Sequence, residues 1–253
     1  MTARELAAYI EGLSPGRGAE EGFRFGAPDV AVAGVLVTWM ATLLAIAAAA
    51  TAGCNFLLAH EALLYPYKFA DDRCLSWPVN AARLAALARH GLVLYRAHGM
   101  LDRHCILDDF RRQLGLPEPV VSEGCIRICE IEPATVADLA RRTKAAVGLA
   151  NVRVCGDPQR VVRRVGLPWG GLGLSVNVGF VEQLREHHPD VLIAGESDEY
   201  AMHFCRDAGM ALIETSHVAS ENEGLRHFAA ELQARFADLK VVFYDAGVPW
   251  QMI

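Results

Sequence analysis

The chain has 253 residues, 53% of them hydrophobic, and 30 acidic against 24 basic side chains give a formal net charge of −6. This length and composition can bury a sizeable core in one large domain or two interlocked ones. The acidic balance argues against a sequence-independent nucleic-acid binder, which needs a basic surface to displace counterions. We therefore expect no nucleic-acid partner.

The cysteines and the N-terminus both predict a cytoplasmic protein. The seven cysteines are odd in number and form no Cys-x-x-Cys pair. This usage favours buried thiols in a reducing compartment over a disulfide scaffold or a zinc ribbon. Met1–Leu6 carries charges where a signal peptide would need an apolar core, so we expect no secretion signal.

The run from Val30 to Ala59 contains no charged residue and is long enough to be a transmembrane candidate. Gly34 and the segment Gly53–Asn55 interrupt it, and its middle is rich in alanine. These features favour a strand, an alanine-rich helix and a second strand. A membrane span, and with it a membrane-attached protein, is the less favoured alternative.

The hydrophobic patterns predict alternating helices and strands. In chain order we predict a helix at 3–13, strands at 22–26 and 30–37, a helix at 40–52, a strand at 55–59, a helix at 80–90, a strand at 92–95, a helix at 106–114, a strand at 125–130, a helix at 135–147, strands at 152–155 and 161–167, a helix at 180–187, a strand at 191–194, a helix at 200–208, a strand at 210–213, a helix at 224–236 and a strand at 241–244. Thr38 and Thr135 are the predicted caps of the helices that follow them. Because the strands at 30–37 and 55–59 are joined by a helix, they should be parallel. The fold class is α/β.

Three acidic–histidine pairs occur in matching contexts. His60-Glu61 ends an apolar run, whereas His98-x-x-x-Asp102 and His217-x-x-x-Glu221 each follow a glycine-ended helix and a short strand. The segments before them also match, so we infer a duplicated unit that places equivalent strand ends opposite one another. An imidazole and a carboxylate at this spacing can bind one ion together. Surface hydrogen bonds within each pair are the alternative, but three pairs favour a shared metal centre.

A glycine loop, Gly170-Gly171-Leu172-Gly173, precedes a predicted helix. Its backbone N–H groups could cradle a phosphate. The loop lacks the Walker lysine and the spacing of a dinucleotide fingerprint. A tight turn is the favoured interpretation.

Several of these motifs together resemble one known family. They are Leu57–Tyr65, Ala97–Asp102 and Ser216–Glu221, accompanied by Gly22–Gly26, Val35–Thr38 and Gly195-Glu196. In this order they resemble the Nif-three-like dinuclear metal-centre proteins, some of which carry the name GTP cyclohydrolase I type 2 homologue. The resemblance extends over nearly the whole chain.

The resemblance implies an α/β fold of two intertwined, related halves with mixed sheets, in the short form without an inserted domain. We expect one half at 1–118 together with 196–253, carrying most of the metal ligands, and the other at 119–195. It also implies a homo-oligomer, a ring-shaped hexamer around paired metal ions.

The family's metal ligands map onto His60, Asp102, His217 and Glu221, with His98 beside them. Glu61 stands where the family has a second histidine. Glutamate can still ligate zinc, iron or manganese, and as an oxygen donor it favours harder ions than imidazole does. We therefore expect one or two divalent ions per chain.

A second departure lies near Tyr200, where the family has a histidine. A residue expected in or near the site is therefore missing.

The ligand set predicts a metal-dependent hydrolase in which bound ions lower the pKa of a water. His98 is the predicted proton shuttle, because an imidazole titrates near neutral pH. A nucleotide- or pterin-like or phosphate-containing substrate is implied by the resemblance alone. The alternative is a non-catalytic metal-binding or scaffold protein whose second metal site, at Glu61, is degenerate.

Overall fold

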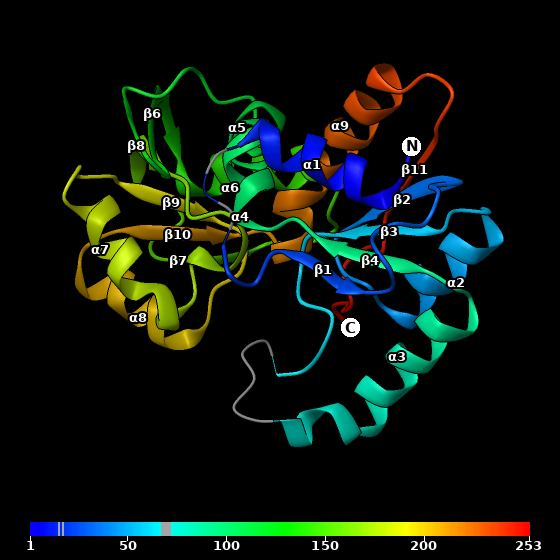
Figure 1. The fold of residues 1–253 in the computed structure, drawn as a ribbon. Helices are drawn as coiled ribbons and strands as arrows, with labels where there is room; N and C mark the ends of the chain where they lie inside the picture. Colours follow the sequence, from blue (N-terminus) through cyan, green and yellow to red (C-terminus); the bar gives the residue numbers. More distant parts are fainter. Residues whose placement is uncertain (15, 17, 67–71) are drawn as a thin grey trace. The chain divides into compact units, whose positions relative to one another are not determined.

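The computed structural model describes residues 1–14, 16, 18–66 and 72–253. By their internal contacts they form two compact units, Met1–Cys105 with Gly224–Ala246 and Ile106–Glu223 with Gly247–Ile253. Each unit contains one mixed sheet covered by helices (Figure 1). The predicted α/β class with two interleaved halves is confirmed.

The first unit is built on a five-stranded sheet in the order β1-β4-β3-β2-β11. Its elements are α1 (Ala3–Leu13), β1 (Gly22–Phe25), β2 (Gly34–Thr38), α2 (Leu43–Thr51), β3 (Phe56–Ala59), α3 (Pro78–Arg89), β4 (Val93–Arg96), α4 (Gly99–Leu101), the later turns of α9 (His217–Arg235) and β11 (Lys240–Tyr244). β1 is antiparallel to β4, whereas β4, β3, β2 and β11 are parallel neighbours.

The central strands β2, β3 and β4 are buried along their whole length. They read as continuous apolar runs because helices cover both faces of the sheet. α2 and α3 lie over one face, where Ile46, Leu57 and Leu87 share a core cluster (Figure 1). On the face that carries α1, the buried Tyr95 stacks on Phe56 at 6.0 Å between ring centroids.

The second unit is built on a six-stranded sheet in the order β5-β6-β8-β9-β10-β7. Its elements are α5 (Leu107–Gln113), β5 (Val121–Glu123), β6 (Ile126–Thr135), α6 (Val136–Ala146), β7 (Arg153–Cys155), β8 (Val161–Gly166), α7 (Val178–Arg185), β9 (Val191–Ala194), α8 (Glu199–Asp207), β10 (Ala211–Glu214) and the first turns of α9. β8, β9 and β10 are parallel neighbours, and β7 is antiparallel to β10. α7 and α8 cover one face, with Val181, Leu184 and Cys205 in the core.

The two sheets bear out the predicted internal repeat. In both units three parallel strands are linked by two helices, β2-α2-β3-α3-β4 in the first and β8-α7-β9-α8-β10 in the second. An antiparallel edge strand lies beside the last of the three, β1 in one unit and β7 in the other. β3 is therefore equivalent to β9, and β4 to β10. The units differ at the opposite edge, where β11 is parallel to β2 and β6 is antiparallel to β8.

Two predicted helix starts are wrong. α2 is capped by Thr42, whose hydroxyl accepts a hydrogen bond from the Ala45 N–H at 3.1 Å. Thr38 is instead the last residue of β2, because it pairs with both neighbouring strands. α9 begins at His217 and not near 224, so its first turns carry the predicted ligand pair. The Thr135 cap of α6 is confirmed.

The chain passes between the two units at 105/106, 223/224 and 246/247, whereas the predicted limits of the halves are 118/119 and 195/196. Residues 196–223, predicted with the first half, belong by contacts to the second unit, since β10 pairs in parallel with β9. The uncharged run Val30–Ala59 forms β2, the nine-residue helix α2 and β3, as predicted. Within the described ranges, none of the helices combines the length and apolarity that a membrane crossing requires.

Candidate metal centre

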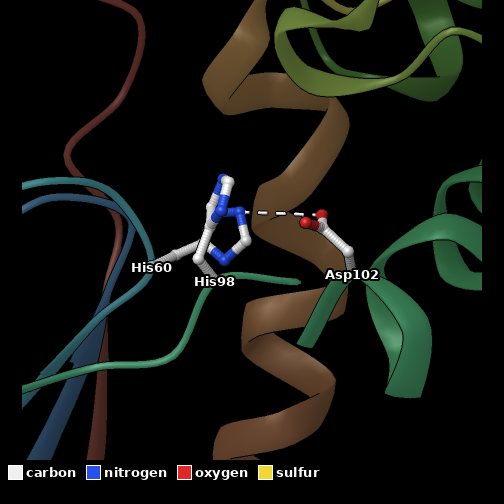
Figure 2. Close-up of side chains that lie close together, drawn as sticks. All are labelled: His60, His98 and Asp102. Atoms are coloured by element: carbon white, nitrogen blue, oxygen red, sulfur yellow. Dashed lines mark ion pairs between the residues drawn. The ribbon is translucent and has the colours of Figure 1, made fainter. Parts of the chain in front are cut away.

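Two predicted ligands, His60 and Asp102, and the predicted proton shuttle, His98, meet at the carboxyl ends of β3 and β4. His60 directly follows β3, and His98 follows β4 after a single residue. These strands are parallel neighbours, so their carboxyl ends lie at one edge of the sheet, which is the usual place for ligand-binding side chains. Asp102 begins a π-helical turn just beyond. One ligand atom from each of the three side chains lies within 4.8 Å of the other two (Figure 2).

His60 is oriented as a metal-binding histidine. It is fully buried, and its Nδ1 lies 3.0 Å from the carbonyl oxygen of Ala97. A carbonyl can only accept, so Nδ1 carries the proton and Nε2 presents a lone pair, as in metal-binding histidines whose other ring nitrogen donates to a carbonyl. Nε2 lies 3.7 Å from Asp102 Oδ1 (Figure 2). This distance is too long for a hydrogen bond. Two ligand atoms that share one ion, each at about 2.0–2.2 Å from it, lie about 3–4 Å apart. The donor set therefore fits a divalent ion.

His98 lies beside His60, with 4.7 Å between the ring centroids. Its Nε2 is 3.8 Å from Glu61 Oε1, and its Nδ1 is 3.8 Å from Glu20 Oε1. Burial lowers the pKa of His98 below 6.5 and the neighbouring His60 lowers it further, while Asp102 and Glu61 act in the opposite direction. A neutral imidazole can serve either as a ligand or as a proton acceptor.

Glu21 holds the backbone that carries His98. This buried carboxylate accepts two backbone N–H groups at Oε1, from His98 at 2.7 Å and from Met100 at 2.9 Å. Such charge-assisted hydrogen bonds are the stronger kind, so they fix the turn after β4. The sequence alone cannot single out Glu21, because Glu20 beside it has the same side chain. Only the structure shows that Glu21 is buried and that Glu20 is half-exposed.

Arg96 is a second residue that the sequence does not reveal. As the last residue of β4 it is buried, and its Nε donates to the backbone oxygen of His60 at 3.1 Å. Its Nη2 lies 3.7 Å from Glu61 Oε2. A permanent positive charge therefore lies next to the predicted ligand Glu61.

His217 and Glu221 form a group in the second unit, at the place equivalent to His98 and Asp102. His217 follows β10, and its Nε2 lies 3.3 Å from Glu221 Oε1 one turn along α9, as the spacing predicts. Its Nδ1 lies 3.0 Å from a carboxylate oxygen of Glu196, which lies two residues beyond β9, as Glu61 lies two residues beyond β3. The resemblance marked Glu196 only as part of a turn, and its contact with His217 depends on the sheet.

The glycine loop is a tight turn packed against this group. The N–H of Gly170 donates to Ser220 Oγ at 2.9 Å, so this amide is engaged within the unit. Gly170 has a positive φ of 54°, and a Cβ there would overlap Glu221 Oε1. The structure thus favours the turn over a phosphate cradle. Tyr200, near which a histidine is absent, is 84% exposed on α8.

Comparisons with known proteins agree on one family. The family model Duf34/NIF3 (NGG1p interacting factor 3) matches residues 1–248. The "GTP cyclohydrolase 1 type 2 homolog" of Pseudomonas aeruginosa is 28% identical over 180 residues, covering 66% of this chain and 67% of the relative. The protein of the same name from Escherichia coli K12 is 30% identical over 176 residues, with the same coverage. A hypothetical protein of Staphylococcus aureus has the same fold, with a TM-score of 0.82, 17% identity and coverage of 100% of this chain and 99% of that one.

Proposed function

The chain belongs to the Duf34/NIF3 family, and from this premise we propose that it is a metal-dependent hydrolase of a nucleotide- or pterin-like or phosphate-containing small molecule. The observation that carries the proposal is the His60–His98–Asp102 group at the carboxyl ends of two parallel strands. The ion is zinc, iron or manganese, all of which accept imidazole and carboxylate ligands. The names of the curated relatives support the substrate class.

We also propose that His217 and Glu221 are metal ligands. Support comes from the internal repeat, in which this pair occupies the place of His98 and Asp102 on equivalent strands. The family resemblance of the Ser216–Glu221 motif supports the same assignment.

His60, His98 and Asp102 each have a distinct role in the proposed chemistry. A bound divalent ion supplies Lewis acidity at the site. His60 would hold it through Nε2, in an orientation set by the Ala97 carbonyl, and Asp102, whose Oδ1 lies 3.7 Å from that Nε2, would be a second ligand. His98 accepts the proton of the attacking water at Nε2, where Glu61 Oε1 at 3.8 Å stabilises the imidazolium that forms.

Replacing Asp102 by alanine is expected to reduce hydrolysis at least about 100-fold, because the change removes a ligand together with its negative charge. The measurement is phosphate release from GTP and from p-nitrophenyl phosphate by protein loaded with manganese or zinc. Asp238→Ala, at an exposed position of the first unit, is the control and should keep the wild-type rate. Equal rates for Asp102→Ala and wild type would refute the hydrolase.

A non-catalytic metal-binding or scaffold protein is the second candidate. The pairing of Glu61 with Arg96 favours it, since a carboxylate engaged by a guanidinium is a poorer metal ligand. Wild-type protein that holds an ion but turns over neither substrate would support this candidate over the hydrolase.

For the assembled state we propose a homo-hexamer. α2 carries no charged residue, and Leu43 and Leu44 on it are 47% and 72% exposed. Exposed apolar surface of this kind is typical of subunit contacts. Light scattering should give six times the 27.5 kDa chain mass, and Leu44→Glu should give a smaller species. A wild-type monomer at micromolar concentration would contradict the assembly.

A cytoplasmic location is part of the same proposal. All seven cysteines are free thiols, and six of them are buried. A chain that leaves its cysteines unpaired suits a reducing compartment.

A further inference from the structure

A buried ion pair lies directly beside the candidate metal ligands. The side chains of Arg96 and Glu61 are each 5% exposed, and 3.7 Å separates Nη2 from Oε2. Arg96 is the last residue of β4, and Glu61 lies two residues beyond the end of the parallel strand β3. The two residues are close because Ala59 of β3 pairs in register with Arg96. The ion pair is therefore built into the sheet edge that presents His60.

The guanidinium cannot easily leave this position. Its Nε donates to the backbone oxygen of His60 at 3.1 Å, so the same group that pairs with Glu61 is tied to the strand end. Removing it would leave a buried carboxylate without this cation, which is unfavourable at low exposure.

A fixed positive charge opposes a divalent cation at the same carboxylate. Charges of like sign a few ångströms apart repel strongly where water is excluded. An ion bound by Glu61 would have to compete with Arg96 for Oε2 and would lie close to its charge. The site on His60 and Asp102 differs, because His60 Nε2 faces a carboxylate at 3.7 Å.

We propose that Arg96 takes the electrostatic place of a second metal ion, so that the chain binds one divalent ion, with His60 and Asp102 among its ligands. Glu61 then serves as the partner of Arg96 and holds no ion. The inference rests on the proposed metal-binding function. In the pattern of the family, a second histidine stands at the position of Glu61.

The test is the number of ions per chain after equilibrium dialysis against zinc chloride or manganese chloride, counted by elemental analysis. Wild type should hold one ion. Arg96→Gln removes the charge and should raise the count to two, because Glu61 becomes available. Arg96→Lys keeps the charge without the planar fork and should stay at one. Arg83→Gln, which removes an equally buried arginine bonded to the Leu63 carbonyl, should also stay at one.

The outcomes separate the two proposals. Two ions in wild type, or one ion in folded Arg96→Gln, would overturn the role of Arg96. No ion in wild type would overturn metal binding itself. If Arg96→Gln fails to give the wild-type circular dichroism spectrum, the wild-type count alone still decides between one ion and two.

Discussion

Replacement of His60 by alanine is expected to weaken zinc or manganese binding at least about 100-fold, since even the loss of residues that merely support a ligand costs about 10–100-fold. His60 is fully buried, and its tautomer is set by the Ala97 carbonyl, so its Nε2 is held ready for the ion before binding. Preorganisation of this kind is lost together with the ligand. A competition titration against a chelator of known affinity measures the change.

The same variant should lose its thermal response to metal. A ligand that binds only the folded chain at about 100 times its Kd stabilises it by about 2.7 kcal/mol. Wild-type protein should therefore melt at a higher temperature with the ion than without it, and His60→Ala should lose most of this rise. His90→Ala is the matched control, an exposed histidine at the end of α3 in the same unit. A metal-dependent rise in the melting temperature of His60→Ala as large as that of wild type would show that the ion binds elsewhere.

Replacement of Gly195 by alanine is expected to destabilise the protein by about 3 kcal/mol or more, within the range of severe steric substitutions. A Cβ at this position would overlap the backbone nitrogen and oxygen of Gly170 and would lie 2.5 Å from Ser220 Oγ. The Gly170 carbonyl also accepts the Glu196 N–H at 2.7 Å, so the glycine loop cannot move away without breaking this contact.

Gly179 provides the control for that change. It lies in α7, and a Cβ there would meet no atom within 4 Å. Gly179→Ala should therefore be neutral or stabilising by up to about 1 kcal/mol, because alanine favours the helix. Urea denaturation of both variants measures the free energy of unfolding. If Gly195→Ala unfolds within 1 kcal/mol of wild type, the close crossing at this turn does not constrain the fold.

Elements with a strong local pattern were predictable to the residue. β9 runs from Val191 to Ala194, as the short apolar run between polar segments indicates. α1 runs from Ala3 to Leu13 because its apolar residues recur on one face and Thr2 caps it. The start of α2 was not predictable in the same way. Thr38 and Thr42 are both good caps, and only the pairing of β2 with its neighbours assigns Thr38 to the sheet.

The spacing of histidines and carboxylates, taken alone, determined which side chains are candidate ligands and that they recur in a duplicated unit. Tertiary structure alone decided what surrounds them. Glu21 meets the His98 N–H from 77 residues away, and Arg96 reaches the His60 carbonyl across 36 residues. No local pattern encodes such contacts, because they form only when β1 and β3 pair with β4, β1 antiparallel to it and β3 parallel. The charge beside Glu61, and with it the expected number of ions, is therefore a property of the folded sheet.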